Sequence, residues 1–428
     1  MTESIPSNTA VFPHTPDRSH PAAQANSLRW PRALALSLVL HLSACGGGGG
    51  AAGTQIEPVA GVAPELTLAA LGERIFTDAN LSEPRGTACV ACHRANLGFA
   101  GNNGSTLGVA LGSHAGALGL RNAMTNSYSN FIPSFGYITV DGVTEPMGGL
   151  FWDGRADTLA LQALGPLLNP LEMNNTGAPS VVDKIARSNY AEAFKKHFGA
   201  DIFTSTRTDQ AFSRIGEAIA AFESSPTMQS FSSKFDAMVL GQASFTPAEE
   251  RGMALFSRED KGNCAACHTM NLQSGNPRDS LFTDFTYYAT GVPRNAKIPR
   301  NADPAFFDLG LCGPDRAPPV LPANAPAELT QDSLCGKFRM PTLRNAAERP
   351  AFMHNGAFKT LREVLVFYAN RNSGVTSDDL PAKYQINLEK SKPPFNRSPS
   401  AGPALNEAEI NDMLSFLRTL SDGFVRTP

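Results

Sequence analysis

The sequence predicts an all-α fold made of two similar halves. Three observations support this expectation: apolar residues recur at helical spacing, a cysteine–histidine motif occurs twice in similar surroundings, and little in either half alternates like a strand. The 428 residues are enough for two or three domains. Their formal net charge of −3 gives no electrostatic argument for a nucleic-acid partner, and none is expected.

The first element is an apolar run near the N-terminus, LALSLVLHLSAC, which follows a basic stretch. It is too short to span a membrane and has the layout of an export signal. Residues 42–45 resemble a bacterial lipobox with Cys45 as the lipidated residue, and an ordinary cleaved signal is the alternative. We therefore expect a leader and lipoprotein-type signal peptide over residues 1–45 and a Gly-rich tether over residues 46–60. The protein would be periplasmic, held to the membrane by a lipid anchor only.

The next element is the motif C-x-x-C-H, which occurs as CVACH at residues 89–93 and as CAACH at residues 264–268. It is the attachment signature of c-type haem, in which two thiols form thioethers with the porphyrin and the adjacent histidine ligates the iron. A redox CxxC or half of a zinc site is the alternative, but no second pair of zinc ligands follows. The sequence therefore predicts two haem c groups. Their expected binding residues are Cys89, Cys92, His93, Cys264, Cys267 and His268.

Similar helices surround the two motifs. A short helix with a glycine and a final phenylalanine precedes each of them, as LGERIF and as RGMALF. Each half also closes with an amphipathic helix, over residues 210–223 and 406–420. This order of helix, haem motif, loops and closing helix is the plan of a cytochrome c domain. We expect an N-terminal domain over residues 61–228 and a C-terminal domain over residues 229–428.

Two cysteines remain, Cys312 and Cys335. In an oxidising compartment a disulfide between them is expected as a structural staple. Two separate buried thiols are the alternative.

A short helix is also expected late in the chain, because TLRE at residues 360–363 forms a capping box. Leu361, Val364, Leu365 and Tyr368 then fall at i, i+3, i+4 and i+7, which predicts one buried face. The last residue of this face carries a hydroxyl where a leucine or methionine would pack as well.

The segment FWDGRADTLALQALGPLLNPLEM, residues 151–173, lies between the two haem motifs. Together with GVPRN, FRMPTLRN and FMHNG, in this order, it resembles the bacterial di-haem cytochrome c peroxidases and their relative MauG over nearly the whole mature chain. The resemblance implies a peroxide-reactive haem in the N-terminal domain and an electron-transfer haem in the C-terminal domain.

The resemblance also implies roles for four residues around the first haem. Glu172 would move a proton between the two oxygens of the peroxide, and Gln162 would orient the peroxide by hydrogen bonding. Trp152 would lie between the haems and pass electrons. His114, in a Gly-rich loop, would be a candidate ligand of the first haem iron. Without the resemblance, these would be solvated polar residues, a core aromatic and an exposed loop histidine.

A calcium ion between the domains is implied as well. Asn122 matches the family's side-chain ligand, and Arg349 and Ala351 match positions that supply main-chain carbonyls. The family often has Thr and Pro at these last two positions, so this chain departs from the pattern there.

Tyr368 stands where the peroxidases of the family carry a methionine that ligates the second haem, fourteen residues after His354; MauG has tyrosine there. A thioether ligand favours reduced iron, whereas a phenolate favours oxidised iron. Tyr368 is therefore the expected partner of His268 on the second iron, and Met340 and Met353 are the alternatives.

These expectations combine into one function. The chain would be an exported di-haem c enzyme that reacts with hydrogen peroxide at the N-terminal haem and stores oxidising equivalents over both haems. It would act as a cytochrome c peroxidase or a MauG-like oxidase, discharging either to a donor protein (a cytochrome c or cupredoxin) or to a protein substrate. A non-catalytic di-haem electron-transfer cytochrome is the alternative.

Overall fold

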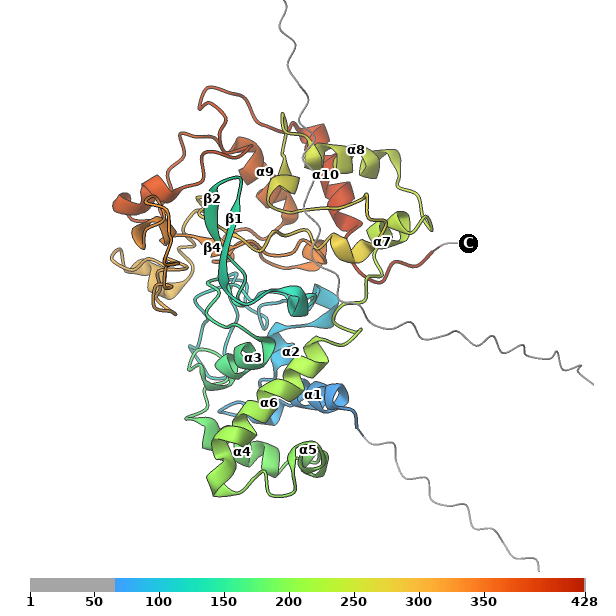
Figure 1. Ribbon diagram of the computed structural model, residues 1–428, viewed down its shortest axis with the longest axis vertical. Helices are drawn as coiled ribbons and strands as arrows, with labels where there is room; N and C mark the ends of the chain where they lie inside the picture. Colours follow the sequence, from blue (N-terminus) through green and yellow to red (C-terminus); the bar gives the residue numbers. More distant parts are fainter. Residues whose placement is uncertain (1–65, 427–428) are drawn as a thin grey trace, which may run out of the picture. The chain divides into compact units, whose positions relative to one another are not determined.

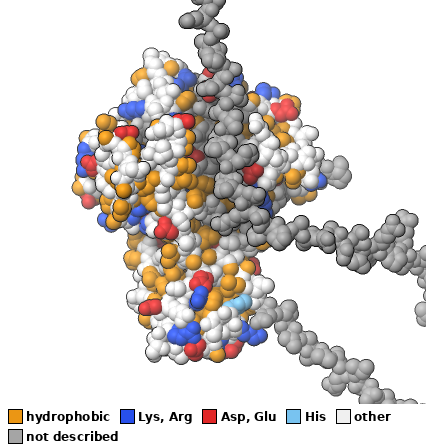
Figure 2. All heavy atoms as spheres, in the orientation of Figure 1, with side chains coloured by type: hydrophobic (Ala, Val, Ile, Leu, Met, Phe, Trp, Pro, Cys, Tyr) orange, Lys and Arg blue, Asp and Glu red, His pale blue; other side chains and the backbone are white. Residues whose placement is uncertain are grey.

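The computed structural model describes residues 66–426. The leader, the lipobox cysteine Cys45 and the Gly-rich tether lie outside the described residues, so their assignments stay predictions. Within the described range, none of the helices is both long and apolar enough to cross a membrane. On the face shown in Figure 2, positive and negative side chains are interspersed.

The first group of helices surrounds α6, Thr208–Glu223. Helices α1, α3 and α4 pack against it, as Figure 1 shows. Their apolar faces form one buried core, which extends from Leu71 to Met228 along the chain. The bounds of the other helices in this group are Leu68–Thr77 (α1), Cys89–Cys92 (α2), Leu159–Leu168 (α3), Ala178–Ala186 (α4) and Ala191–Phe198 (α5).

The second group surrounds α10, Glu407–Arg418, which packs against α8 and α9. Its core extends from Phe235 to Leu420 along the chain. The other bounds are Lys234–Val239 (α7), Pro247–Ser257 (α8) and Leu361–Asn370 (α9). The helices expected before each haem motif and at the end of each half therefore form. The two cores fall on either side of the expected boundary at residue 228, while their assignment to two cytochrome c domains stays a prediction.

The same helix crossing occurs in both groups. A Cβ atom added at Gly72 of α1 would lie 1.8 Å from the main-chain oxygen of Ala218 in α6. A Cβ atom at Gly252 of α8 would lie 2.1 Å from the main-chain oxygen of Asp412 in α10. Only glycine leaves room for such a close approach of two helix backbones. The glycine noted in each short helix therefore has a packing role.

The all-α expectation misses a β-hairpin. Strands β1 (Gly136–Val140) and β2 (Val143–Met147) pair antiparallel, with Val140 opposite Val143. The intervening Asp141 and Gly142 have φ of 50° and 80°, which suits a two-residue hairpin turn. The chain is thus helix-rich with few strands. A second pair joins β3 (Tyr287–Tyr288) to β4 (Phe338–Arg339).

Short 3-10 helices interrupt the long loops of the described range. Their bounds are Ala79–Leu81, Ala95–Leu97, Ser129–Phe131, Ser205–Arg207, Cys264–Ala266, Pro277–Asp279, Pro299–Ala302, Asp332–Leu334, Ala346–Glu348 and Ala382–Asn387. A disulfide joins Cys312 to Cys335, the pair expected from the sequence, and closes the loop that contains residues 313–334.

Candidate functional site

The cavities in the described part of the chain include two large ones, and Trp152 lines both of them. One contains His93 and the other contains His268. With their mouths included, they hold about 1480 Å³ and about 970 Å³ of space between protein atoms. Both are large enough for a sizeable cofactor. The Trp152 ring is 6% exposed, and its Nε1 donates a hydrogen bond of 2.8 Å to the main-chain oxygen of Asn122.

The His93 cavity presents the residues of the first C-x-x-C-H motif. Cys89 and Cys92 lie on the single turn of α2, and His93 caps that turn. The Nδ1 atom of His93 lies 3.1 Å from the main-chain oxygen of Phe99, which leaves Nε2 for another partner. Burial raises the pKa of both cysteine thiols to about 12. Both thiols are thus enclosed by protein at the wall of the cavity.

The His268 cavity repeats this arrangement. The Nδ1 atom of His268 lies 2.9 Å from the main-chain oxygen of Phe282. Burial raises the pKa of the Cys264 and Cys267 thiols to about 12 as well. Cys89 and Cys92 line the first cavity, whereas Cys267 packs against Tyr288 and Met340 in the wall of the second. Two cysteines and a histidine at each cavity are a set that fits a covalently attached haem c.

Gln162 and Glu172 both line the cavity of His93. Gln162 lies on α3, whose N-terminus is capped by the side chain of Thr158. Glu172 follows in the next turn, where Asn169 Nδ2 donates a 2.7 Å hydrogen bond to its Oε1. Burial raises the pKa of Glu172, while the charge of Arg155 and the Asn169 bond lower it. The structure therefore brings together the histidine, the carboxyl and the carboxamide that the sequence suggested.

Arg155 and Asp315 also line this cavity, and the sequence reasoning singled out neither. Arg155 Nη1 lies 3.8 Å from Asp315 and 3.0 Å from the fully buried Asp153. Its guanidinium is stacked 3.6 Å from the centre of the Phe151 ring. The negative charge of Asp315 raises the pKa of Glu172, after the larger effect of burial. Arg155 stands in the quoted FWDGR segment, but nothing in the sequence links Asp315 to it.

Arg121 holds these acids in place. It makes contacts of 2.6 Å with Asp153 and with Asp308, and one of 3.6 Å with Asp315. Asp308 and Asp315 flank Cys312, which the disulfide fixes to Cys335. The disulfide thus holds the loop that delivers a carboxylate to the wall of the His93 cavity.

His114 is not among the described residues that line either cavity. Its Nδ1 atom is buried without a hydrogen-bond partner in the described part of the chain. The main-chain N–H of the neighbouring Ser113 donates a hydrogen bond of 2.7 Å to the main-chain carbonyl oxygen of Glu172. The loop of His114 therefore supports the backbone of Glu172, and a role for His114 on the first iron stays a prediction.

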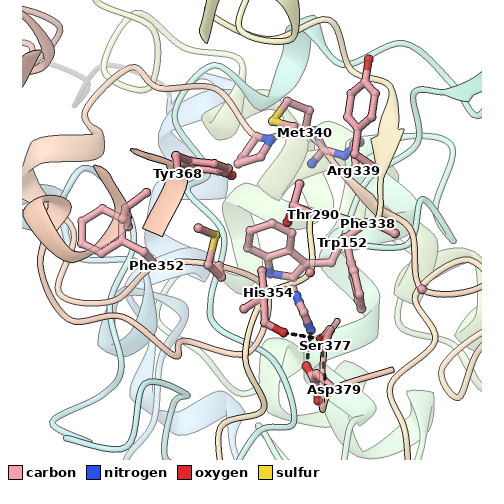
Figure 3. Close-up of a pocket in the computed structure, with 18 of the residues that line it drawn as sticks. Trp152, Thr290, Phe338, Arg339, Met340, Phe352, His354, Tyr368, Ser377 and Asp379 are labelled. Atoms are coloured by element: carbon pink, nitrogen blue, oxygen red, sulfur yellow. Dashed lines mark hydrogen bonds and ion pairs between the residues drawn. The ribbon is translucent and has the colours of Figure 1, made fainter. Parts of the chain in front are cut away.

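Tyr368 lines the His268 cavity, and Figure 3 shows its side chain entering from α9. The capping box of Thr360 and Glu363 starts this helix as expected. Leu361 and Val364 of the predicted buried face line the same cavity, so this face looks into the space beside His268. Burial raises the pKa of the Tyr368 hydroxyl above its usual range.

Met340 and Met353 line the His268 cavity too, so the alternatives to Tyr368 lie within the same space. His354 lines the same cavity, and Figure 3 shows it next to Trp152, with ring centres 6.5 Å apart. Its ring stacks on Phe338 at 3.6 Å, and its Nε2 lies 3.1 Å from a carboxylate oxygen of Asp379. Phe338 and Asp379 therefore fix the position of His354 in the wall of the His268 cavity.

The residues expected to hold calcium also meet. The Asn122 side chain donates hydrogen bonds of 3.0 Å and 3.2 Å to the main-chain oxygens of Ala351 and Met353. The Arg349 side chain turns to the same place and donates to the oxygen of Ala123 at 2.9 Å. In residues 66–426, no group of three or more His, Cys, Asp or Glu side chains could hold a metal ion. The comparisons below do not address calcium, which stays a prediction.

Comparisons with known proteins agree with this geometry. Residues 67–244 match the family model described as di-haem cytochrome c peroxidase. The chain is 33% identical over 382 residues to the methylamine utilization protein MauG of Paracoccus denitrificans, covering 85% of this chain and 92% of that protein. It is 28% identical over 393 residues to the cytochrome c551 peroxidase of Nitrosomonas europaea, covering 90% of each.

A solved structure is similar as well. The diheme peroxidase BthA of Burkholderia thailandensis is 40% identical, with a TM-score of 0.75, over 84% of this chain and 87% of that one. The fold and the two histidine-bearing cavities fit a di-haem oxidoreductase. The chain belongs to the family of di-haem cytochrome c peroxidases and MauG proteins. It is therefore a peroxidase-class enzyme, and the family implies two haem c groups.

Proposed function

We propose that the enzyme reacts with hydrogen peroxide in the His93 cavity and stores the resulting oxidising equivalents over both haems. The observation that carries this proposal is that Gln162 and Glu172 both line the cavity of His93. The acids lining the other cavity, Asp308 and Asp379, are already engaged by Arg121 and by His354. In the described part of the chain, Glu172 differs from these two acids because its printed hydrogen bond comes from an amide and it forms no ion pair.

When bound, the haem supplies an iron that can take up peroxide and exchange electrons with it. Glu172 accepts the proton of the incoming peroxide and returns it to the departing oxygen. Asn169 holds one oxygen of Glu172, so the carboxyl can turn its other oxygen toward the substrate. Gln162 donates a hydrogen bond that orients the peroxide. Arg155 and Asp315 set the charge around this carboxyl.

Trp152 serves electron sharing between the two cavities, since its buried ring lines both. Tyr368 would ligate the second iron as a phenolate, together with His268. Such a ligand disfavours the reduced iron that a good electron-entry haem needs. The second haem would then share oxidising equivalents with the first, which favours a MauG-like oxidase over a peroxidase fed by a small donor protein.

The alternative is a di-haem carrier without catalysis. A carrier of this kind needs no carboxyl or carboxamide in the haem cavity. Glu172 and Gln162 nevertheless line the cavity of His93. The electron source, either a cytochrome c or cupredoxin or a protein substrate, belongs to this proposal, as do the periplasmic location and a lipid at Cys45. The relatives named MauG and cytochrome c551 peroxidase represent both branches of this choice.

The deciding experiment adds hydrogen peroxide to the fully oxidised holoprotein and follows the absorption of both haems by stopped flow. We expect a rapid change at both haems without prior reduction. A reaction that starts only after half-reduction would favour a reductively activated peroxidase with His114 on the first iron. If neither the oxidised nor the half-reduced protein consumes peroxide, the proposed enzyme is refuted. The non-catalytic electron carrier would then be the remaining function. Glu217→Gln, on an exposed part of α6, serves as a control for Glu172→Gln.

A further inference from the structure

Arg349 places a buried guanidinium beside the proposed calcium site. The side chain is only 9% exposed, and no carboxylate in residues 66–426 forms an ion pair with it. One nitrogen, Nη2, donates to the main-chain oxygen of Ala123, while Nε is buried without a partner. A buried cation is costly unless it meets an anion or oriented carbonyl dipoles.

The guanidinium remains charged at neutral pH. An arginine side chain is not deprotonated in proteins under such conditions. Its charge reaches both cavities: Arg349 lines that of His268, and it lowers the pKa of His93, after the larger effect of burial. A fixed positive charge therefore stands between the two sites in this chain.

The surrounding oxygens are poorly suited to calcium. Ca²⁺ takes six to eight oxygen ligands, commonly with carboxylates among them. Here the main-chain oxygens of Ala351 and Met353 already accept N–H groups from Asn122. The main-chain oxygen of Asn122 accepts Nε1 of Trp152. With no suitable acidic cluster in the described chain and a guanidinium bonded to the next carbonyl, a second cation would be repelled.

We propose that the Arg349 guanidinium takes the place of calcium at Asn122, so that the holoprotein carries its interdomain cation as a side chain and binds no Ca²⁺ there. The proposal concerns the cation alone and does not depend on which donor or substrate the enzyme uses.

The first test is metal analysis of the holoprotein after equilibration with calcium and gel filtration. We expect well below one calcium per chain, and we expect EGTA to leave the melting temperature and the haem absorption unchanged. About one calcium per chain, released by EGTA with a fall in the melting temperature, would overturn the proposal. Neither reading involves peroxide, so the outcome is independent of the proposed reaction.

The second test uses variants. Arg349→Thr should create a site whose occupancy raises the melting temperature when calcium is added, whereas Arg349→Lys should stay indifferent to calcium. Arg187→Thr is the control, because that side chain is 77% exposed on α4's C-terminal side. An Arg349→Thr protein that folds and ignores calcium would contradict the proposal. Should it fail to fold, the wild-type metal content and the response of Arg349→Lys to EGTA decide.

Discussion

The Nδ1 atom of His268 lies 2.9 Å from the main-chain oxygen of Phe282. His93 and Phe99 have the same relationship at 3.1 Å, and both phenylalanines have positive φ, 54° and 53°. A bulky residue rarely adopts this conformation, which here aims a carbonyl at the imidazole. The repeat is not visible in the sequence, because the phenylalanine follows one histidine by 14 residues and the other by 6. In both halves this contact would leave Nε2 for the iron of a bound haem.

Removing the Tyr368 hydroxyl should change the second haem and spare the first. In Tyr368→Phe we expect the spectroscopic signature of a phenolate-ligated low-spin haem to disappear, because no other hydroxyl replaces it on that helix face. In Tyr368→Met we expect a higher reduction potential, since a thioether favours reduced iron. Electron paramagnetic resonance and a redox titration measure the two effects. An unchanged spectrum in Tyr368→Phe would transfer the ligand role to Met340 or Met353, which share the cavity.

Glu172→Gln should slow peroxide consumption by a factor on the order of one hundred, because the amide cannot relay a proton. Haem attachment and the resting spectra should stay as in the wild type. Stopped-flow rates of both variants, with Glu217→Gln as the matched control, test this. Equal rates in Glu172→Gln and the wild type would exclude Glu172 as the proton relay.

The pH dependence of the peroxide reaction should report the charges around Glu172. The carboxyl must be deprotonated to accept a proton, so the rate falls as pH falls through its pKa, which burial raises above the ordinary value of 4.5. Asp315→Asn removes a negative charge that raises this pKa, and the acid limb should shift to lower pH. Arg155→Met removes a positive charge that lowers it, and the limb should shift to higher pH. The acid limbs of the two variants should thus move in opposite directions. Shifts in the same direction would contradict the assignment of the acid limb to Glu172.

Glu223, the last residue of α6, should make folding stability depend on pH. Burial raises its pKa from 4.5 to about 8, and the Asn126 amide only partly offsets this. The folded state therefore keeps a proton that the unfolded state loses above pH 4.5. The stability from this group is complete below pH 4.5 and is lost as pH rises to about 8, by up to about 1.4 kcal/mol per pH unit.

Glu223→Gln keeps the shape of the side chain without a charge. It should flatten the fall in stability between pH 5 and 8 and raise the melting temperature at pH 8. Thermal melts of the holoproteins across this range measure the effect. The same slope in both proteins would mean that Glu223 is not the group responsible.

Local signals made much of this architecture predictable. The capping box of residues 360–363 and the periodicity of residues 406–420 are both local signals within a single helix, so α9 and α10 form where expected. The hairpin at residues 136–147 was missed although its Asp-Gly turn between β-branched residues is a local signal. Periodicity alone predicts that the face of α9 is buried but not what it borders; the family resemblance was needed to expect Tyr368 beside His268.

The charged part of the site could not be predicted in this way. Arg121, Asp153 and Asp315 come from three distant segments and meet only through the fold. Glu223 is a buried polar residue at the end of an otherwise apolar face of α6. A glutamate at this spacing does not predict burial. For Arg349, the family resemblance predicts a main-chain oxygen as a calcium ligand. The structure shows in addition that its buried side chain bonds to the main-chain oxygen of Ala123.

The close crossings at Gly72 and Gly252 have a consequence for how this protein tolerates change. Each glycine faces a backbone oxygen that cannot rotate away, so even alanine would push two helices apart. Neither residue lines a cavity in the described chain. In a saturation library selected for haem-loaded protein, these two positions should be as intolerant as the haem-bearing cysteines. Sensitivity to mutation in this enzyme would therefore identify close contacts between helix backbones as well as the haem-binding positions.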